Sequence, residues 1–164
     1  MRVEFEHRHG RITLELASER ETDTLGAAIA SAIKSGQVIG LIGGLGAGKT
    51  RLCRAIAEAL GVDPAAIASP TYVLIHEYDG TMPISHFDAY RLDGPDAFDA
   101  FDAIGAAEYF EAGGLCLVEW ADLVLDRLPP DSWLIHLATT GIESRSIAIE
   151  GQRLDALALA IERA

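Results

Sequence analysis

The sequence predicts one α/β domain with three layers, in which helices cover a mixed sheet of parallel and antiparallel strands. Its 164 residues are the length of one ordinary domain. Two short, continuously apolar runs, Val38–Ile42 and Leu115–Val118, are typical of strands that are covered on both faces. Helical stripes and alternating strand patterns stand around these runs, so residues 1–164 are predicted to form a single domain.

The N-terminal part predicts a hairpin followed by a helix. Apolar and polar residues alternate through residues 3–16 on the two sides of a turn at Gly10, as in a short amphipathic hairpin. Ser18 and Glu21 stand at the spacing of a capping box, which starts a helix. An apolar residue then recurs every four positions until Gly36 ends the pattern.

The middle of the chain continues the alternation of strands and helices. After the buried strand at residues 38–42, an apolar stripe from about residue 48 to 61 predicts a second helix. Residues 72–78 and 84–90 are rich in β-formers and are joined by a turn with Gly and Pro, which predicts an antiparallel hairpin. Pro95 is expected to open a short helix.

The C-terminal part predicts a return to the sheet and a final helix. The second buried strand, residues 115–118, comes first. Residues 133–138 and 144–149 then read as an antiparallel pair around Gly141. Apolar residues three and four positions apart between 154 and 161 predict the last helix.

Composition and charge restrict the possible functions. The 25 acidic residues outnumber the 13 basic ones and give a net charge of −12. Because such a chain repels nucleic-acid phosphates, binding of RNA or DNA by the chain alone is not expected. Cys53 and Cys116 form no C-x-x-C pair, which fits a reducing cytoplasm. No run is long and apolar enough for a membrane span, and no signal peptide is recognised.

Residues 43–50 match the G-x-x-x-x-G-K-[ST] pattern of a phosphate-binding loop. The loop lies between a buried strand and an amphipathic helix, which predicts a P-loop NTPase fold. Its glycines let backbone N–H groups converge on phosphate oxygens beside the positive end of the helix dipole. We expect Lys49 to contact the β- and γ-phosphates and Thr50 to ligate Mg²⁺. The expected phosphate-binding residues are Gly43, Gly44, Leu45, Gly46, Ala47, Gly48, Lys49 and Thr50.

Two carboxylates are candidates for the metal and the attacking water. Open α/β sheets place such groups at the carboxyl ends of their strands. Glu119 directly follows the apolar run at residues 115–118 and is the first candidate for the metal. Asp88 follows the strand pattern at residues 84–87 and is the second candidate. It would serve either as a metal partner through water or as the group that orients the attacking water. The simpler alternatives are a surface glutamate and a turn aspartate.

ATP is the expected nucleotide. GTPases read guanine with an Asn-Lys-x-Asp motif, and the chain contains no Asn. Residues 102–105 spell D-x-x-G, but they fall in a helical stretch, so we interpret the match as chance. His76, His86 and Asp88 lack a third His or Cys at ligand spacing, which argues against a metal cluster on the hairpin.

Five segments together resemble the TsaE family, the bacterial ATPases of tRNA threonylcarbamoyladenosine synthesis. They are Gly43–Thr50, Ser69–Tyr72, His86–Leu92, Glu108–Phe110 and Cys116–Trp120. The phosphate loop alone is generic, whereas S-P-T-Y, H-F-D-x-Y-R-L and V-E-W in this order are specific. The resemblance covers nearly the whole chain, from about residue 18 to residue 149.

The resemblance implies a small Mg²⁺-dependent ATPase that serves a partner enzyme pair, TsaD and TsaB. That pair transfers the threonylcarbamoyl group to the adenosine beside the anticodon of tRNA, so this chain would meet tRNA only through the complex. Neither DNA nor a membrane is an expected partner. In this interpretation Lys49, Asp88 and Glu119 are catalytic, and Asp88, Glu119 and Thr50 serve the metal.

The resemblance also implies further contacts with the nucleotide. Thr71 would lie near the γ-phosphate and Mg²⁺ in a segment that behaves like a switch, and Trp120 would lie beside the site. Glu19 and Thr22 are expected on the adenine side, and Gly141 beside the nucleotide.

Two positions depart from the family pattern G-D-L-G-A-G-K-T-T. Gly44 replaces the acidic residue, and Arg51 replaces the second threonine. Because the main phosphate groups remain, ATP binding is expected to survive. Gly44 lacks the carboxylate that the family pattern has at this position, and the rate of ATP hydrolysis is the property that this loss affects.

Two other functions fit parts of the sequence. A small P-loop kinase would pass the γ-phosphate to a metabolite, but it would need an acceptor pocket and usually a lid with several arginines. A nucleotide-gated assembly factor would act through ATP binding alone. A Glu119 or Asp88 substitution that still binds ATP would separate hydrolysis from gating.

Overall fold

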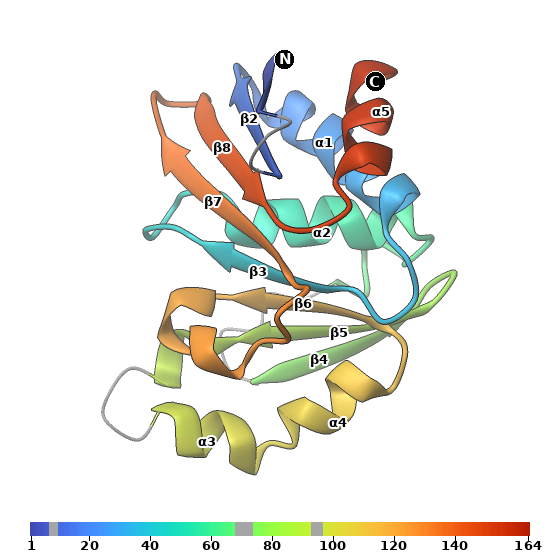
Figure 1. The fold of residues 1–164 in the computed structure, drawn as a ribbon, viewed down its shortest axis with the longest axis vertical. Coiled ribbons are helices and arrows are strands. Elements are labelled where there is room, and N and C mark those ends of the chain that lie inside the picture. Colours follow the sequence, from blue (N-terminus) through green and yellow to red (C-terminus); the bar gives the residue numbers. More distant parts are fainter. Residues whose placement is uncertain (7–9, 68–73, 93–96) are drawn as a thin grey trace.

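Eight strands form one mixed sheet in the computed structural model, which describes residues 1–6, 10–67, 74–92 and 97–164 (Figure 1). The strand order is β1-β2-β8-β7-β3-β6-β5-β4. The strands are β1 (Arg2–Glu6), β2 (Arg11–Leu16), β3 (Val38–Ile42), β4 (Ile75–Asp79), β5 (Pro83–Asp88), β6 (Leu115–Glu119), β7 (Trp133–Thr139) and β8 (Arg145–Glu150).

The parallel part of the sheet lies at its centre. Strand β3 pairs in parallel with both β6 and β7, and β5 pairs in parallel with β6. The remaining pairs, β1 with β2, β2 with β8, β7 with β8 and β4 with β5, are antiparallel. Strands β3 and β6 are buried along most or all of their length, which explains why each reads as an unbroken apolar run.

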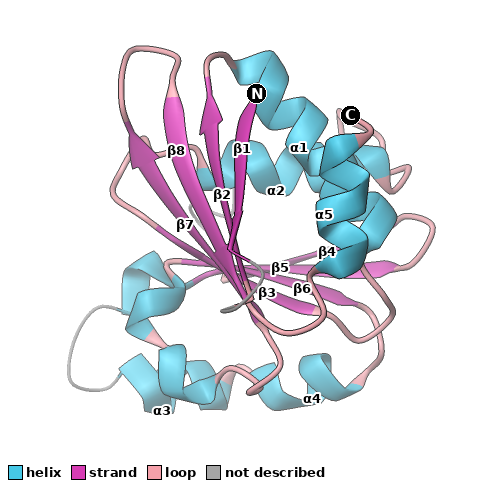
Figure 2. Ribbon diagram, turned by 45° about the horizontal axis from the view of Figure 1, so that its top comes forward, coloured by secondary structure: helices cyan, strands magenta, loops and turns pink. Residues whose placement is uncertain are grey.

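Helices lie on both faces of the sheet, which confirms the three-layer α/β prediction (Figures 1 and 2). One apolar core joins one face to α1 (Glu19–Ala32), α2 (Lys49–Ala59) and α5 (Asp155–Glu162). A second core joins Phe87, Cys116 and Val118 of the other face to α3 (Ala97–Ala103) and α4 (Ala106–Glu111). Three short 3-10 helices, Ala89–Leu92, Ala121–Leu123 and Leu125–Arg127, complete the described elements.

Most predicted elements are confirmed, and the differences fall in short segments. The predicted hairpin forms as β4 and β5, although residues 72 and 73 lie outside the described ranges. Its second strand ends at Asp88 and not at residue 90, because residues 89–92 form a 3-10 helix. Pro95 also lies outside the described ranges, and the helix expected after it is α3. The sequence did not predict α4 or the 3-10 helices, because elements of three to six residues are too short to show periodicity.

Helices α1 and α2 pack closely because of one small residue. Ser18 caps α1 by accepting a hydrogen bond from the Glu21 backbone N–H at 3.4 Å, as the capping box predicts. Gly26 in α1 faces Ala55 in α2, and a Cβ built on Gly26 would lie only 2.5 Å from the Cβ of Ala55. The absence of a side chain at Gly26 therefore sets the separation of the two helices that flank the phosphate loop.

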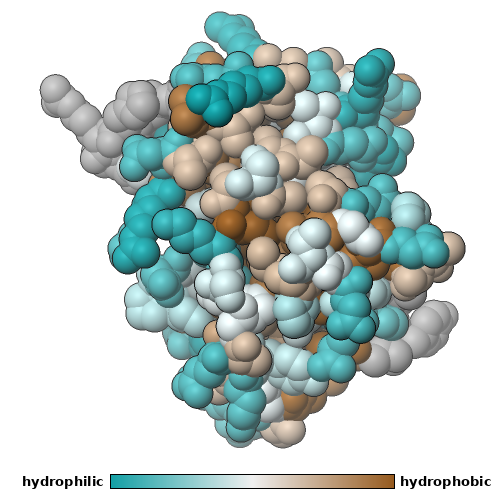
Figure 3. All heavy atoms as spheres, turned by 90° about the vertical axis from the view of Figure 1, so that its right-hand side faces the viewer, coloured by the Kyte–Doolittle hydropathy of each residue, from teal (hydrophilic) through white to brown (hydrophobic). Residues whose placement is uncertain are grey.

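The outer surface is mixed. On the face shown in Figure 3, apolar residues gather across the middle and hydrophilic residues surround them. Among the described residues, no helix combines the length and the apolar character that crossing a membrane requires.

Candidate functional site

The phosphate loop joins the carboxyl end of β3 to the amino end of α2. Gly48, the last residue before α2, has φ 104°, a left-handed conformation that glycine adopts without strain. Gly48 gives α2 no side-chain cap, so the first N–H groups of this helix lack that partner. Glycine is favoured at this position because the chain turns sharply from the loop into the helix, and residues with a side chain rarely adopt this backbone angle.

Lys49 is folded back over the loop. Its Nζ donates to the carbonyl oxygens of Gly43 at 2.6 Å and Gly44 at 3.0 Å, and it lies 3.6 Å from the ring centre of Trp120. The residue is only 4% exposed, and burial lowers the pKa of its ammonium group although the charge of Glu119 opposes this shift. Trp120 has φ 57°, an uncommon left-handed conformation for a bulky residue.

Glu119 is a buried carboxylate with a side-chain contact to each of its oxygens. Thr50 Oγ1 donates to Oε2 at 2.8 Å, and His86 Nε2 lies 2.9 Å from Oε1. Glu119 and His86 are 2% and 1% exposed. The structure therefore brings the loop hydroxyl of Thr50 against the carboxylate that the sequence places at the end of β6.

Asp88 ends β5 directly beside Glu119. The parallel register of β5 and β6 pairs Asp88 with Glu119, and Asp88 is half-buried. Its Oδ1 accepts a hydrogen bond from the Tyr90 backbone N–H at 3.0 Å, which is the contact of a turn aspartate. Asp88 therefore has a structural contact, while its place in the sheet keeps it among the site carboxylates.

A cavity of about 400 Å³ lies over the phosphate loop. Residues of the loop and of α2 line it together with Asp88 and Glu119, and Glu19 and Thr22 of α1 line it as well. Its full lining is Glu19, Thr22, Leu45, Gly46, Ala47, Gly48, Lys49, Thr50, Arg51, Asp88, Tyr90, Glu119, Trp120, Leu137, Glu143, Arg145 and Ile147.

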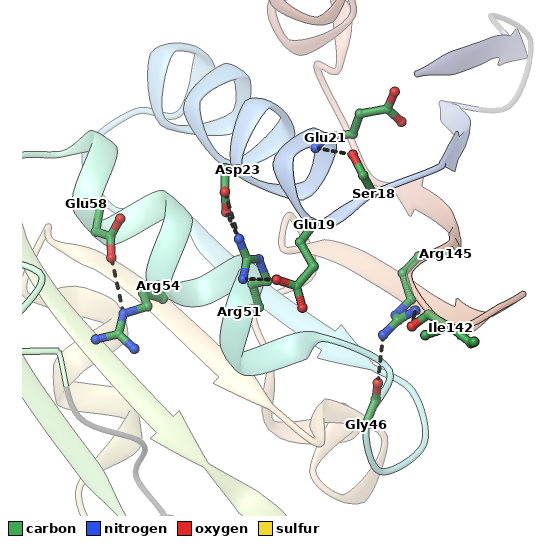
Figure 4. Close-up of polar contacts among 10 residues, drawn as sticks. All are labelled: Ser18, Glu19, Glu21, Asp23, Gly46, Arg51, Arg54, Glu58, Ile142 and Arg145. Carbon is green, nitrogen blue, oxygen red and sulfur yellow. Dashed lines mark hydrogen bonds and ion pairs between the residues drawn. The ribbon is translucent and has the colours of Figure 1, made fainter.

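Arg51 connects α2 to α1 at this cavity (Figure 4). Its guanidinium donates to Glu19 at 2.7 Å and to both oxygens of Asp23 at 3.0 and 2.8 Å. The Arg51 Nε is buried without a hydrogen-bond partner among the described residues. The departure from the family pattern at residue 51 thus adds an ion-pair link between the helices that flank the loop.

Arg145 of β8 ties the loop to the opposite wall of the cavity. Its Nε donates to the Ala47 carbonyl at 3.0 Å, and Figure 4 shows the same guanidinium directed at Gly46. It also donates to the carbonyls of Ser144 at 2.8 Å and Gly141 at 3.3 Å. The guanidinium therefore holds the tip of the phosphate loop against the turn between β7 and β8.

The structure places most of the predicted site residues around one space. Gly43 and Gly44 lie outside the cavity lining and contact Lys49 through their carbonyls. Gly141 also lies outside the lining, and its carbonyl accepts a hydrogen bond from Arg145, which contacts the loop. Thr71 lies outside the described residues.

Sequence reasoning missed three side chains of the site. The sequence places His86 in the H-F-D-x-Y-R-L segment but predicts no role for its side chain. The role of Arg145 gives no sequence signal, because its partner Ala47 lies 98 residues away in sequence. Arg51 was noted only as a departure. The alternation in H-F-D was the one available clue for His86, because it puts His86 and Asp88 on the same face of a strand.

The residues present fit a nucleotide with a hard divalent cation. Thr50, Glu119 and Asp88 offer hydroxyl and carboxylate oxygens, which are the ligands that Mg²⁺ prefers. The Lys49 ammonium, now on two loop carbonyls, is the group that would neutralise phosphate charge. Cys53 Sγ, His86 and Glu119 form a softer donor set within 4.8 Å of one another, but burial keeps the pKa of the Cys53 thiol well above its usual range.

Comparison with known proteins decides the family. Residues 16–147 match the family model described as threonylcarbamoyl adenosine biosynthesis protein TsaE. The chain belongs to the TsaE family. This confirms the resemblance inferred from the phosphate loop and the H-F-D-x-Y-R-L and V-E-W segments.

Individual TsaE proteins match most of the chain. The tRNA threonylcarbamoyladenosine biosynthesis protein TsaE of Bacillus subtilis is 37% identical over 146 residues, 87% of this chain and 89% of its own length. The TsaE of Treponema pallidum is 34% identical over 132 residues, 80% of this chain and 95% of its own length. The crystal structure of Bacillus subtilis YdiB superimposes with a TM-score of 0.72 at 32% identity, covering 99% of this chain and 97% of YdiB.

Proposed function

We propose that this TsaE protein is a Mg²⁺-dependent ATPase that acts on the TsaD–TsaB pair in tRNA threonylcarbamoyladenosine synthesis, without transferring the group itself. One observation carries the proposal. The loop that holds Lys49 and Thr50 lies against Glu119, and Asp88 pairs with Glu119 in the sheet, so cationic, hydroxyl and carboxylate groups face one cavity. This is the set of groups that phosphoryl transfer to water needs.

Each residue has a distinct role in this proposal. The loop N–H groups and Lys49 bind phosphate oxygens, and Lys49 must leave the carbonyls of Gly43 and Gly44 to do so. Thr50 and Glu119 hold Mg²⁺, which when bound neutralises charge on the phosphates. Asp88 orients the attacking water. Glu19 and Thr22 line the cavity at α1, where the base would lie.

A Lys49→Ala variant tests nucleotide binding. Loss of a charge-assisted phosphate contact is worth roughly 1.5–3 kcal/mol and should weaken ATP affinity by about ten- to a hundredfold. Titration calorimetry on the full chain measures it, and Lys34→Ala, which removes the only other lysine, is the matched control. Equal affinities in the parent and in Lys49→Ala would refute the site.

Glu119→Gln and Asp88→Asn separate hydrolysis from binding. Both should keep most of the ATP affinity and lose most of the turnover, because they act on the metal and the water. If both hydrolyse ATP at the parent rate, the two carboxylates are bystanders. Normal support of tRNA modification by a variant that binds ATP without hydrolysing it would favour the gating alternative.

Steady-state ATP turnover with each partner tests the rest of the proposal. The chain alone should be slow, since TsaD and TsaB are proposed to complete the site. TsaD with TsaB should bind it more tightly in the presence of ATP and raise its turnover, and tRNA alone should do neither. Groups supplied in trans raise turnover by roughly 10³-fold or more in other P-loop systems. Full activity without partners would contradict the proposal and favour the kinase alternative.

A further inference from the structure

His86 is a buried titratable side chain that the proposed function leaves unused. It lies on β5 in the interior of the molecule, 1% exposed, and its Nε2 is 2.9 Å from Glu119 Oε1. An imidazole in such a place needs a polar partner, because an unpaired buried donor or acceptor is costly. In the described part of the chain, its side-chain hydrogen-bond partner is the carboxylate proposed to hold Mg²⁺.

The contact fixes the roles of the two Glu119 oxygens. Thr50 Oγ1 occupies Oε2, so Oε1 is left for His86. Since an ionised carboxylate only accepts hydrogen bonds, the ring must carry a proton on Nε2 and donate it. Two donors on opposite oxygens restrict rotation of the carboxylate, so that Oε2 stays on the side of the phosphate loop.

The strand geometry explains why a histidine can do this. Asp88 stands two residues after His86 and therefore on the same face of β5. In the register of β5 and β6, Asp88 is level with Glu119 and His86 is level with Leu117. The imidazole of His86 thus reaches Glu119 from a position on β5 two residues before the one that pairs with Glu119. Asp88 occupies the paired position beside Glu119 at the ends of the two strands.

We infer that His86 is a positioning residue that holds Glu119 in the orientation needed for a divalent cation at Thr50. This inference deepens the proposed function and rests on it for the identity of the cation. It assigns His86 no contact with nucleotide or reacting atoms. Partners that orient a metal-binding carboxylate commonly change metal affinity by 10–100-fold when they are removed.

Three variants of the full chain test the inference. His86→Leu removes the donor at similar volume, and His86→Gln retains an N–H at the reach of Nε2. His136→Leu is the matched control, because His136 also faces a glutamate, Glu150 at 4.0 Å, but is about two-fifths exposed and does not line the cavity. If His86→Leu does not fold by circular dichroism, His86→Asn replaces it, since its shorter amide cannot reach Glu119.

The Mg²⁺ dependence of ATP turnover is the first measurement. His86→Leu should raise the half-saturating Mg²⁺ concentration about tenfold or more, with ATP affinity in EDTA unchanged. His86→Gln should recover most of that loss, and His136→Leu should match the parent. An unchanged Mg²⁺ dependence in folded His86→Leu, or a His86→Gln as impaired as His86→Leu, would show that the ring serves packing alone.

Imidazole ¹⁵N spectra of the parent, without nucleotide or metal, test the contact independently of the ATPase. The His86 ring should carry a proton on Nε2. A ring protonated on Nδ1 alone would overturn the inference, even if the ATPase assays succeed. A parent that lacks Mg²⁺-dependent turnover but shows the expected proton on Nε2 would refute the proposed function and leave the His86–Glu119 contact standing.

Zinc binding is the third measurement, because Cys53 completes a thiol, imidazole and carboxylate set. The inference expects weak Zn²⁺ binding that does not depend on Cys53. Tight Zn²⁺ binding lost in both His86→Leu and Cys53→Ser, but kept in Cys116→Ser, would assign His86 to a metal site and overturn the positioning role.

Discussion

Replacing Gly26 with alanine should separate the two helices that flank the phosphate loop. The new Cβ would lie 2.5 Å from the Cβ of Ala55 and 2.9 Å from its carbonyl carbon, whereas carbon atoms normally approach to about 3.5–4.0 Å. One of these neighbours is backbone, so a change of rotamer cannot relieve the contact. The helices must move apart by roughly 1 Å.

Two effects of opposite sign determine how far Gly26→Ala changes the free energy of unfolding. Alanine in a helix interior is favoured over glycine by about 1 kcal/mol. Overpacking a tight core contact costs typically about 1–3 kcal/mol, and a clash with backbone belongs at the upper end of that range. The free energy of unfolding should therefore fall by about 1–2 kcal/mol, which lowers Tm by roughly 2–8 °C in a domain of this size.

Urea unfolding and calorimetry measure the loss, with a double-mutant cycle as control. In Gly26→Ala/Ala55→Gly the methyl group moves from α2 to α1, so the double variant should be more stable than the sum of the single changes predicts, by about 0.5 kcal/mol or more. ATP affinity should fall in Gly26→Ala, because α1 carries Glu19 and α2 begins at Lys49. If the free energy of unfolding of Gly26→Ala rose by the full ~1 kcal/mol of helix propensity, the close approach of α1 and α2 at Gly26 would be refuted.

Three further outcomes follow from the site. Arg145→Lys should weaken ATP affinity about threefold to tenfold by calorimetry, because one ammonium cannot hold both the phosphate loop and the turn after β7. At pH 8, Cys53 and Cys116 should resist thiol reagents until the protein is denatured, since burial raises both pKa values, that of Cys116 to about 12. Lys49→Met should raise the free energy of unfolding at neutral pH, because burial lowers the pKa of the charged Lys49 ammonium. That gain should shrink in urea titrations as pH rises towards the ordinary lysine value of 10.5, where the parent loses the buried charge.

Local patterns were sufficient for most of the fold. The unbroken apolar run before Gly43 predicted a strand covered on both faces, and β3 is the central strand with parallel neighbours. The capping box predicted where α1 begins. The order of strands was not predictable, because it depends on pairing between segments far apart in sequence.

In the candidate site too, local motifs were predictable from the sequence and contacts between distant segments were not. Gly43–Thr50 is a contiguous motif whose chemistry is local, and strand ends suggested Glu119 and Asp88. His86 and Arg145 act through partners 33 and 98 residues away, so their place became visible only in three dimensions. Arg51 had no expected partner, because Glu19 and Asp23 belong to another helix.

The central position of β3 has a consequence for synthesis of the protein. The strand that leads into the phosphate loop finds both of its sheet neighbours, β6 and β7, in the C-terminal half of the chain. A ribosome must therefore release residues up to 139 before β3 has a neighbouring strand on both sides. Until then at least one edge of Val38–Ile42 is unpaired, and unpaired strand edges make incomplete chains prone to aggregation. A ligand that requires the finished cavity would stabilise only the completed fold.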